Sequence, residues 1–348
     1  MSTHMSLPET IQNGAQLDDL LSAPTDGVVQ TFRRMEGDLI LLGVGGKMGP
    51  SLARMARRAT EAAGVPRRIF GVSRFSRPET QAALNAQGIE TIACDLLDLE
   101  ALHRLPDVPN VVFMAGTKFG TTGQEALTWA MNSFLPGMIC QKFRHSRIVA
   151  FSTGNIYPLS PLTLGGSVET DPPGPIGEYA MSCLGRERIL EHFSRTLSVP
   201  TAILRLNYAI ALRYGVLTDI ARQIRDGRPI PLTMGMVNVI WQGDANAMAL
   251  QCFDHATSPP FVINLAGPEQ LSVRRIAMQL GELLQQSPRF EGEEAPNALL
   301  SNGQMAHHLF GYPRVSVRQM VHWTADWIRR GGEELDKPTH FEVRDGQF

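Results

Sequence analysis

The residues best suited to chemistry lie in "EYAMSCLGRERIL", residues 178–190, where Tyr179 and Cys183 are four positions apart on one face of an amphipathic helix. A tyrosine is deprotonated to a useful extent near neutral pH only if a neighbouring group lowers its pKa from about 10. A cysteine thiol, with a pKa of about 8.5, is mostly neutral at pH 7 and supplies no fixed positive charge. No histidine lies near Cys183 in the sequence to activate it as a nucleophile. We therefore expect Cys183 to pack as a small apolar side chain.

A glycine-rich turn, "LLGVGGKMGPSLA", joins a predicted buried strand at 37–44 to a predicted helix at 50–64. Glycine lacks a Cβ atom, so backbone N–H groups and a helix N-terminus can approach a pyrophosphate there. We predict a dinucleotide site at Gly43, Gly46, Lys47, Met48 and Gly49. The alternative is a turn whose glycines serve only the chain reversal.

The end of the second predicted strand, "GVSRFSR", bears on the choice of cofactor. Domains that select NAD usually place an acidic residue there, to accept hydrogen bonds from the ribose hydroxyls. This chain has Ser73 and Arg74, with Arg77 behind them. An arginine can pair with a 2′-phosphate, so the sequence favours NADP, with NAD as the alternative. A solvated basic loop is the other interpretation.

Strands and helices alternate along the first 210 residues. Apolar runs predict seven strands, at 37–44, 67–74, 90–96, 110–116, 147–153, 200–207 and 261–267, and amphipathic stretches predict the helices between them. This alternation is typical of an α/β fold with a Rossmann-type, doubly wound parallel sheet and a smaller C-terminal substrate-binding lobe.

We divide the chain into four parts. Residues 1–36 form an N-terminal extension with one or two short helices, broken by Pro24 and Gly27. The dinucleotide-binding domain covers 37–210, with returning segments up to about 265, residues 211–332 are mainly the substrate-binding lobe, and 333–348 form a polar tail.

Composition excludes several classes of function. The net charge is −2, from 32 basic and 34 acidic side chains, which gives no electrostatic reason to expect nucleic acid or a membrane surface as a partner. Four widely spaced cysteines and no Cys/His cluster argue against a metal site and suggest buried thiols in a reducing cytoplasm. No signal peptide or membrane-spanning run is present, so we expect a cytoplasmic protein that acts on a small molecule.

Taken in order, the motifs resemble the extended short-chain dehydrogenase/reductases, the NAD(P)-dependent epimerase/dehydratase family, over roughly residues 37–332. The turn at 43–49 is similar to the family's GxxGxxG motif. The other similar segments are "CDLLD" (94–98), "FMAGTKFG" (113–120), "WAMNSFLPG" (129–137), "FSTGNIY" (151–157), "EYAMS" (178–182), and two lobe segments at 263–277 and 307–321.

The resemblance implies an oxidoreductase or epimerase and assigns roles to residues. Tyr179 would exchange a proton with a substrate oxygen while hydride moves to or from a nicotinamide, and Thr153 would polarise the same oxygen. The predicted catalytic residues are Thr153, Tyr179 and Lys118. The predicted cofactor-binding residues are Gly43, Gly46, Lys47, Met48, Gly49, Ser73, Arg74, Asp95, Leu96, Ala115, Gly116, Lys118, Asn132, Tyr179 and Asn207.

Position 183 departs from the family, which has a lysine there to lower the pKa of the tyrosine. Three interpretations stay open at this point. Lys118, in the loop after the fourth strand, could supply the missing charge. Alternatively, Tyr179 acts mainly as an acid and tolerates an ordinary pKa, or the chain is a catalytically degenerate, cofactor-binding regulatory protein.

The substrate side departs as well. Methionines and Trp241 stand where a diphosphate-binding basic residue is expected, and only Arg213 offers a further cation nearby. We therefore predict a small carbohydrate-like substrate, a sugar, polyol or sugar acid, in place of a nucleotide-linked sugar. Relatives often dimerise through helices that include the tyrosine helix, so a homodimer is expected.

Overall fold

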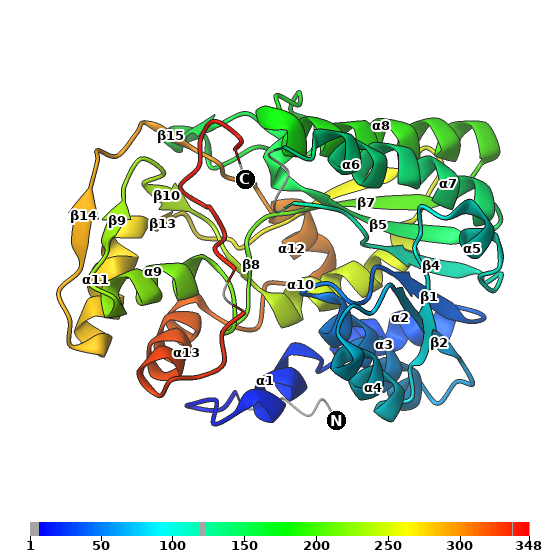
Figure 1. Cartoon of the computed structure of the whole chain (residues 1–348), viewed down its shortest axis with the longest axis horizontal. Coiled ribbons are helices and arrows are strands. Elements are labelled where there is room, and N and C mark those ends of the chain that lie inside the picture. Colours follow the sequence, from blue (N-terminus) through cyan, green and yellow to red (C-terminus); the bar gives the residue numbers. More distant parts are fainter. Residues whose placement is uncertain (1–6, 119–122, 336, 348) are drawn as a thin grey trace.

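The computed structural model describes residues 7–118, 123–335 and 337–347. Of the predicted terminal segments, residues 1–6, 336 and 348 lie outside this description. At its centre is a seven-stranded parallel sheet of order β12-β7-β5-β4-β1-β2-β3 (Figure 1). Its strands are β1 (Leu39–Leu42), β2 (Ile69–Ser73), β3 (Glu90–Ala93), β4 (Asn110–Phe113), β5 (Arg147–Thr153), β7 (Thr201–Leu206) and β12 (Phe261–Leu265). The predicted fold class is confirmed, and all seven predicted strands are present.

Helices cover both faces of the sheet because its central strands are apolar on both sides. Leu39 and Leu41 of β1 pack on one face with Phe32 and Leu52, whereas Ile40 and Leu42 pack on the other face. The first face is covered by α2 (Asp26–Arg34), α3 (Gly49–Ala63), α10 (Gln242–Gln251) and α12 (Gln304–Phe310), with α4 (Pro78–Ala86) beside α3. The second face is covered by α5 (Leu99–His103), α7 (Leu135–Lys142) and α8 (Gly177–Leu197).

The helical segment between β4 and β5 has a break in its winding. It consists of α6 (Glu125–Trp129), a π-helical turn η1 (Ala130–Phe134), and α7. Pro136 has no N–H to donate to the carbonyl of Asn132, four residues back, which favours such a local change of winding. The Asn132 carbonyl instead accepts a hydrogen bond from Arg186 of α8.

The lobe is built from three helices and four short strand pairs. The helices are α9 (Val216–Arg225), α11 (Val273–Leu284) and α13 (Val317–Arg329). The pairs are β8 (Ala209–Ile210) with β11 (Ile240–Trp241), β9 (Pro229–Pro231) with β14 (Arg289–Glu291), β10 (Met236–Val237) with β13 (Leu271–Ser272), and β6 (Ser160–Pro161) with β15 (Asn297–Ala298). Single 3₁₀ turns are η2 (Gly154–Ile156), η3 (Leu162–Leu164) and η4 (Cys252–His255). The lobe core contains Trp241 and Trp323, with ring centroids 5.3 Å apart.

The described part of the N-terminal segment packs onto the rest of the chain. Two helices, α1 (Gly14–Leu21) and α2, are capped by Asn13 and Thr25. Their apolar faces bury Leu17 and Phe32. The predicted break at Pro24 separates them, but Gly27 lies in the first turn of α2, so it does not end a helix.

The tail after α13 runs across the front of the molecule, between the lobe and the sheet (Figure 1). Its only fully apolar anchor among the described residues is Phe341, which is 1% exposed and belongs to the lobe core. Thr339 donates to the Asp219 carboxylate through both its N–H and its hydroxyl. At the far end, Gly346 lies against the backbone of Ile176 and Gly177, where α8 begins.

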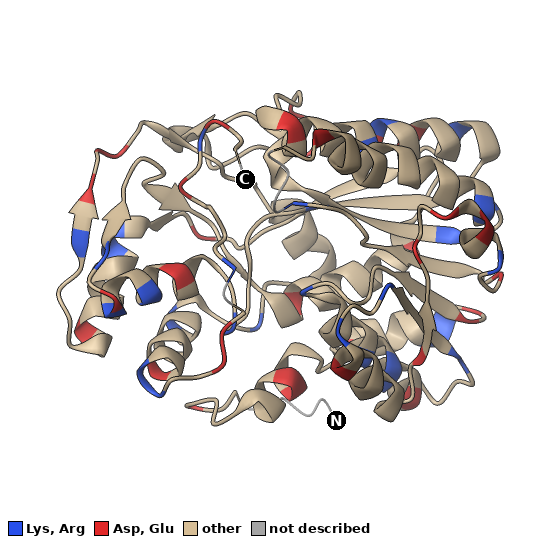
Figure 2. Cartoon of the chain, in the orientation of Figure 1, with Lys and Arg blue, Asp and Glu red and all other residues tan. Residues whose placement is uncertain are grey.

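Charged residues are interspersed over the described chain, with basic and acidic segments alternating along the outer helices (Figure 2). No helix among the described residues has both the length and the apolar content to cross a bilayer. Within the same residues there is no grouping of three or more His, Cys, Asp or Glu side chains suited to a metal ion.

Candidate active site

The glycine turn lies between β1 and α3, next to the point where the strand order of the sheet reverses. Gly43 has φ +98°, and a Cβ atom there would lie 2.6 Å from the Ala115 nitrogen. At Gly49 a Cβ atom would lie 2.1 Å from the Val44 carbonyl oxygen. No described side chain caps the N-terminus of α3. The turn therefore leaves open backbone and a helix N-terminus at the edge where parallel sheets bind dinucleotides, and these features fit a pyrophosphate.

A cleft of about 730 Å³ runs from this turn to Tyr179. It brings together eight of the predicted cofactor-binding residues: Gly43, Gly46, Lys47, Met48, Gly116, Lys118, Asn132 and Tyr179. Ala115 lies against Gly43, and Gly49 lies behind the turn. Phe151 and Ser152 also line the cleft, so five of the segments that the motifs had singled out contribute to it.

The remaining predicted residues lie outside the cleft lining. Asn207 lines a neighbouring pocket. Ser73 lies beside Gly45, where a Cβ atom would be 2.5 Å from its hydroxyl oxygen. Asp95 and Leu96 follow β3, and the Asp95 carboxylate accepts a hydrogen bond from the Leu97 N–H. Arg74 is exposed and does not line the cleft, whereas Arg77 does.

A smaller pocket, of about 140 Å³, adjoins the cleft where Thr153 and Tyr179 meet. Thr153 ends β5 and Tyr179 lies in the first turn of α8, so a buried strand and a long helix fix their separation. The Tyr179 hydroxyl is hydrogen-bonded to Thr153. Lys118 completes this group, with its Nζ 5.9 Å from the centre of the Tyr179 ring. The structure therefore brings all three predicted catalytic residues together.

The electrostatics of the pocket are set by burial. Burial raises the pKa of Tyr179 well above its usual value, and Cys183 raises it further, whereas the hydrogen bond to Thr153 and the charge of Arg186 lower it. Burial lowers the pKa of Lys118 to about 8, against the opposing effects of Cys183, Asp219 and Glu342. Burial also raises the pKa of the Cys183 thiol. Cys183 itself is 2% exposed and packs with Ile156 and Tyr157, in agreement with its expected role as a small apolar side chain.

Several side chains of the site were missed by sequence reasoning. Arg186 lines the cleft two turns after Tyr179. Tyr214 lines both the cleft and the pocket, and the Lys47 ammonium lies 3.5 Å from its ring centre. The position of Arg186 in the tyrosine helix was the one available signal, since Arg186 lies on the same helical face as Cys183.

The tail also contributes to the site. Leu335 and Lys337 line the cleft, and Thr339 lines the pocket. The Thr339 carbonyl accepts a hydrogen bond of 3.5 Å from the Lys118 ammonium. A polar sequence gave no indication of these contacts, because they depend on the tail crossing the lobe.

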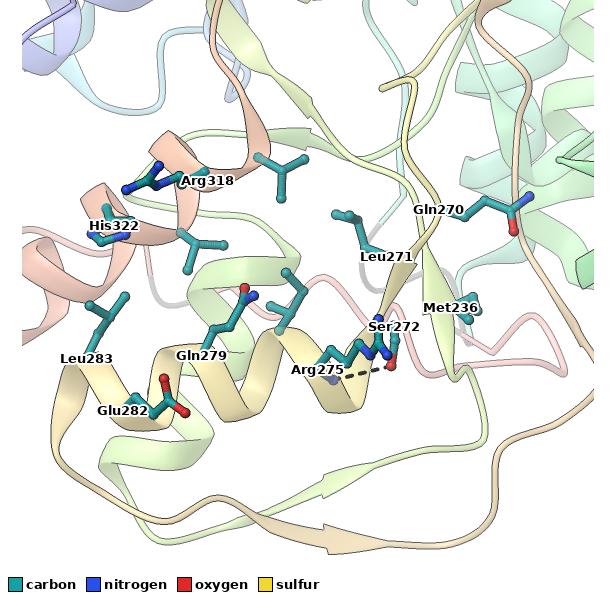
Figure 3. A pocket seen from close by; sticks show the side chains of 13 residues that line it. Met236, Gln270, Leu271, Ser272, Arg275, Gln279, Glu282, Leu283, Arg318 and His322 are labelled. Atoms are coloured by element: carbon teal, nitrogen blue, oxygen red, sulfur yellow. Dashed lines mark hydrogen bonds between the residues drawn. The ribbon is translucent and has the colours of Figure 1, made fainter.

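A separate groove of about 800 Å³ lies in the lobe between α11 and α13 (Figure 3). Arg275 and Gln279 of α11 face Arg318 and His322 of α13 across it. Met236 lines this groove and not the catalytic pocket. The groove shares no lining residue with the dinucleotide cleft or the catalytic pocket.

A parallel sheet with a glycine turn at its point of reversal, and a threonine–tyrosine pair beside that turn, defines a Rossmann-type fold of the class that holds dinucleotides. The sequence model of the NAD dependent epimerase/dehydratase family matches residues 39–246. Because the match covers more than half of the chain, the protein belongs to this family, and the predicted resemblance is confirmed. Members of the family are enzymes, so the prediction of an enzyme is confirmed as well. No curated protein sequence matches the chain.

Solved structures share the fold at low sequence identity. The UDP-glucuronic acid 4-epimerase from Bacillus cereus, solved with NAD, has a TM-score of 0.69 and 18% identity over 84% of this chain and 97% of its own. The dTDP-glucose 4,6-dehydratase from Bacillus anthracis, also solved with NAD, has a TM-score of 0.71 and 14% identity, covering 85% and 97% of the two chains. The UDP-glucose 4-epimerase from Thermotoga maritima, solved with UDP-glucose, has a TM-score of 0.69 and 16% identity, covering 84% and 99%.

Proposed function

We propose that the protein is an NAD(P)-dependent oxidoreductase or epimerase that acts on a small carbohydrate-like molecule, a sugar, polyol or sugar acid. The observation that supports this function best is the Thr153–Tyr179 pair, placed where the dinucleotide cleft opens into a pocket of about 140 Å³. The pair is where a substrate oxygen and a nicotinamide would meet.

Three residues of the chain, Tyr179, Thr153 and Lys118, have separate roles in the proposed reaction. A bound nicotinamide dinucleotide supplies the hydride acceptor or donor. Tyr179 takes the proton of a substrate hydroxyl as the phenolate, or gives its proton to a carbonyl as the phenol, and Thr153 orients the same substrate oxygen. Lys118 provides a positive charge beside the tyrosine ring, which favours the phenolate. Burial and the nearby tail limit the access of water to these groups.

The dimensions of the pocket support a small substrate. Drug-sized ligands occupy pockets of about 300–1,000 Å³, well above the volume beside Tyr179. The cation predicted near a diphosphate is also engaged elsewhere, since Arg213 forms ion pairs with Asp18 and Glu333. Asn155 and Asn207 offer polar groups suited to hydroxyls. A compact polyol or sugar acid fits this lining better than a nucleotide-linked sugar does.

For the cofactor, we propose NADP, with NAD as the alternative. The end of β2 has no acidic side chain to accept from the ribose hydroxyls, and Arg77 lines the cleft beside Ser76. A guanidinium there can pair with a 2′-phosphate. The family name and the solved relatives point to NAD, so the binding assay includes both cofactors.

The test is a two-stage assay. Titration with NADP, NADPH, NAD and NADH measures dinucleotide binding first. The loaded protein is then mixed with a panel of free sugars, sugar acids and polyols, together with UDP-glucose and UDP-glucuronic acid. Nicotinamide absorbance reports net redox, and NMR of the products reports epimerisation without net redox. Turnover of a free sugar, sugar acid or polyol is expected. Turnover confined to the nucleotide-linked compounds would contradict the proposed substrate class, and absence of dinucleotide binding would contradict the whole assignment.

We further propose a homodimer formed through α6, η1 and α8. Large apolar side chains are exposed along these elements: Leu127, Trp129, Phe134, Ile176 and Met181. Phe134 is 65% exposed, which is unfavourable for an unpartnered surface. Light scattering after gel filtration is expected to give twice the mass of one chain, and Phe134→Glu to reduce it to one. Leu164→Glu, at a residue that is 68% exposed on η3, is the matched control and should leave the dimer intact.

A further inference from the structure

Arg186 is a buried cation on the same face of α8 as Tyr179 and Cys183. Its guanidinium donates to the carbonyl oxygens of Phe151 at 2.7 Å and Ala115 at 3.1 Å. It also donates to the carbonyl oxygen and the side-chain oxygen of Asn132, at 3.3 and 2.8 Å. All four acceptor oxygens are neutral. The side chain is therefore held rigidly while its charge is not compensated by its hydrogen-bond partners.

The charge has no acidic partner among the described residues. No carboxylate in residues 7–118, 123–335 or 337–347 forms an ion pair with Arg186. The adjacent Glu187 is committed to Arg205, with 2.8 Å between their side chains. A buried charge without a partner is costly, and its field acts on the groups around it because little water screens it. An anion that forms nearby is stabilised by the same field.

The chain holds this cation in a defined place. The carbonyl of Asn132 that accepts from Arg186 is the one to which Pro136 cannot donate. Arg186 also lines the dinucleotide cleft with Tyr179 and Cys183. Two small buried side chains of α8, Ser182 and Cys183, lie between Tyr179 and Arg186 on this helical face.

Resting on the proposed function, we infer that Arg186 is a positioning residue that supplies to Tyr179 the fixed positive charge that position 183 lacks. In this chain the cation lies at position 186, one turn further along α8 than position 183, where the family has its lysine. Tyr179 can then release its proton although the neighbouring side chain is a neutral thiol.

The surrounding charges are consistent with this assignment. Arg186 lowers the pKa of Tyr179 and that of Cys183, in opposition to burial. Lys118 differs from Arg186 because its pKa is about 8, whereas an arginine stays charged at every pH the enzyme meets. Among the described residues, the other charged groups that act on these side chains are Glu187 on α8, Asp219 on α9, Lys47 in the glycine turn and Glu342 in the tail. The neighbouring titratable tyrosines are Tyr157, Tyr208 and Tyr214.

The experiment removes the positive charge at position 186 or transfers it to position 183, and measures turnover as a function of pH. Arg186→Gln is expected to lower turnover at pH 7 by about 10-fold and to shift the Tyr179-dependent limb by about one pH unit upward. Arg186→Lys keeps the charge and should stay within about threefold of the parent. The double variant Arg186→Gln/Cys183→Lys should recover most of the lost turnover. A parent-like pH profile in Arg186→Gln, or equal losses in the Gln and Lys variants without recovery in the double variant, would overturn the inference.

A further measurement keeps the test independent of the substrate. With ¹³Cζ-labelled tyrosine, the NMR signal absent from Tyr179→Phe reports the ionisation of Tyr179 in the dinucleotide-bound protein without any substrate. Its ionised fraction at alkaline pH should fall in Arg186→Gln and not in Arg186→Lys. If the parent binds dinucleotide but turns over no compound of the panel, this signal still decides the role of Arg186.

Discussion

The two walls of the active site are held in different ways. The sheet wall consists of the glycine turn, Thr153 and Tyr179, each at the end of a buried strand or at the start of a long helix. The opposite wall consists of Tyr214 and the tail residues Leu335, Lys337 and Thr339, all in loops. The tail is anchored at single points such as Phe341. This difference indicates that the sheet wall fixes the chemistry, whereas the loop wall selects what reaches it.

A change in the glycine turn of the sheet wall should have the largest effect on dinucleotide binding. In Gly43→Ala, the new Cβ would lie 2.6 Å from the Ala115 nitrogen at a residue with φ +98°. The turn must shift, and dinucleotide affinity should fall by about 100-fold. Gly64→Ala is the matched control, because Gly64 also has a positive φ but no atom within 4 Å of a Cβ. Calorimetric titration should show unchanged affinity in that control, and a similar loss in both variants would mean that backbone strain alone is responsible.

Release of the tail should affect mainly the loop wall. Phe341→Ala removes a fully buried aromatic ring, a change that typically costs about 3–5 kcal/mol of packing. We expect faster hydrogen exchange over 333–335 and 337–347 and a KM for the small substrate raised about 10-fold. The dissociation constant of the dinucleotide should change by less than about threefold. Tyr312→Ala, at a ring that is 69% exposed, is the control. Equal effects on substrate and dinucleotide would argue against separate roles of the two walls.

The affinities for NADP and NAD test the role of the two arginines that follow β2, Arg74 and Arg77. Arg77 lines the cleft and Arg74 does not. Arg77→Ala should therefore weaken NADP by about 10-fold and leave NAD nearly unchanged, since a charge-assisted bond to a phosphate is lost. Arg74→Ala should change either affinity by less than about twofold. The reverse pattern would restore the sequence-based assignment of Arg74, and no effect of either substitution would favour NAD as the cofactor.

The smallest expected effect is a pH dependence at the junction of the two walls. Lys118 has a pKa of about 8, so its charge is present below pH 8 and is lost as the pH rises through that value. If this charge assists Tyr179, turnover should be about half its maximum near pH 8 and should decline further above it. Lys118→Arg should shift this decline to higher pH. If the pH dependence of turnover is unchanged in Lys118→Arg, the charge of Lys118 does not assist Tyr179.

The sequence predicted the sheet wall well because its signals are local. Apolar runs mark the strands, and the glycines at 43 and 49 meet steric limits that arise within one βα unit. It predicted the loop wall poorly because those contacts join distant segments. The hydrogen bond from Lys118 to the Thr339 carbonyl depends on the path of the tail across the lobe. The hydrogen bond from Arg186 to the Asn132 carbonyl depends on the packing of two helical segments. The shift from Arg74 to Arg77 has the same origin, since the path of a loop decides which guanidinium faces the cleft.

The central claim is that Tyr179 transfers the proton in an intact dinucleotide site despite the cysteine at 183. The most direct measurement is the rate of nicotinamide reduction or oxidation in a single turnover, for the parent chain and for Tyr179→Phe loaded with the same dinucleotide. We predict unchanged dinucleotide affinity and a rate lower by about 10²–10⁴-fold in the variant, the range expected for loss of a general acid or base. A Tyr179→Phe protein that turns over at the parent rate would contradict the account.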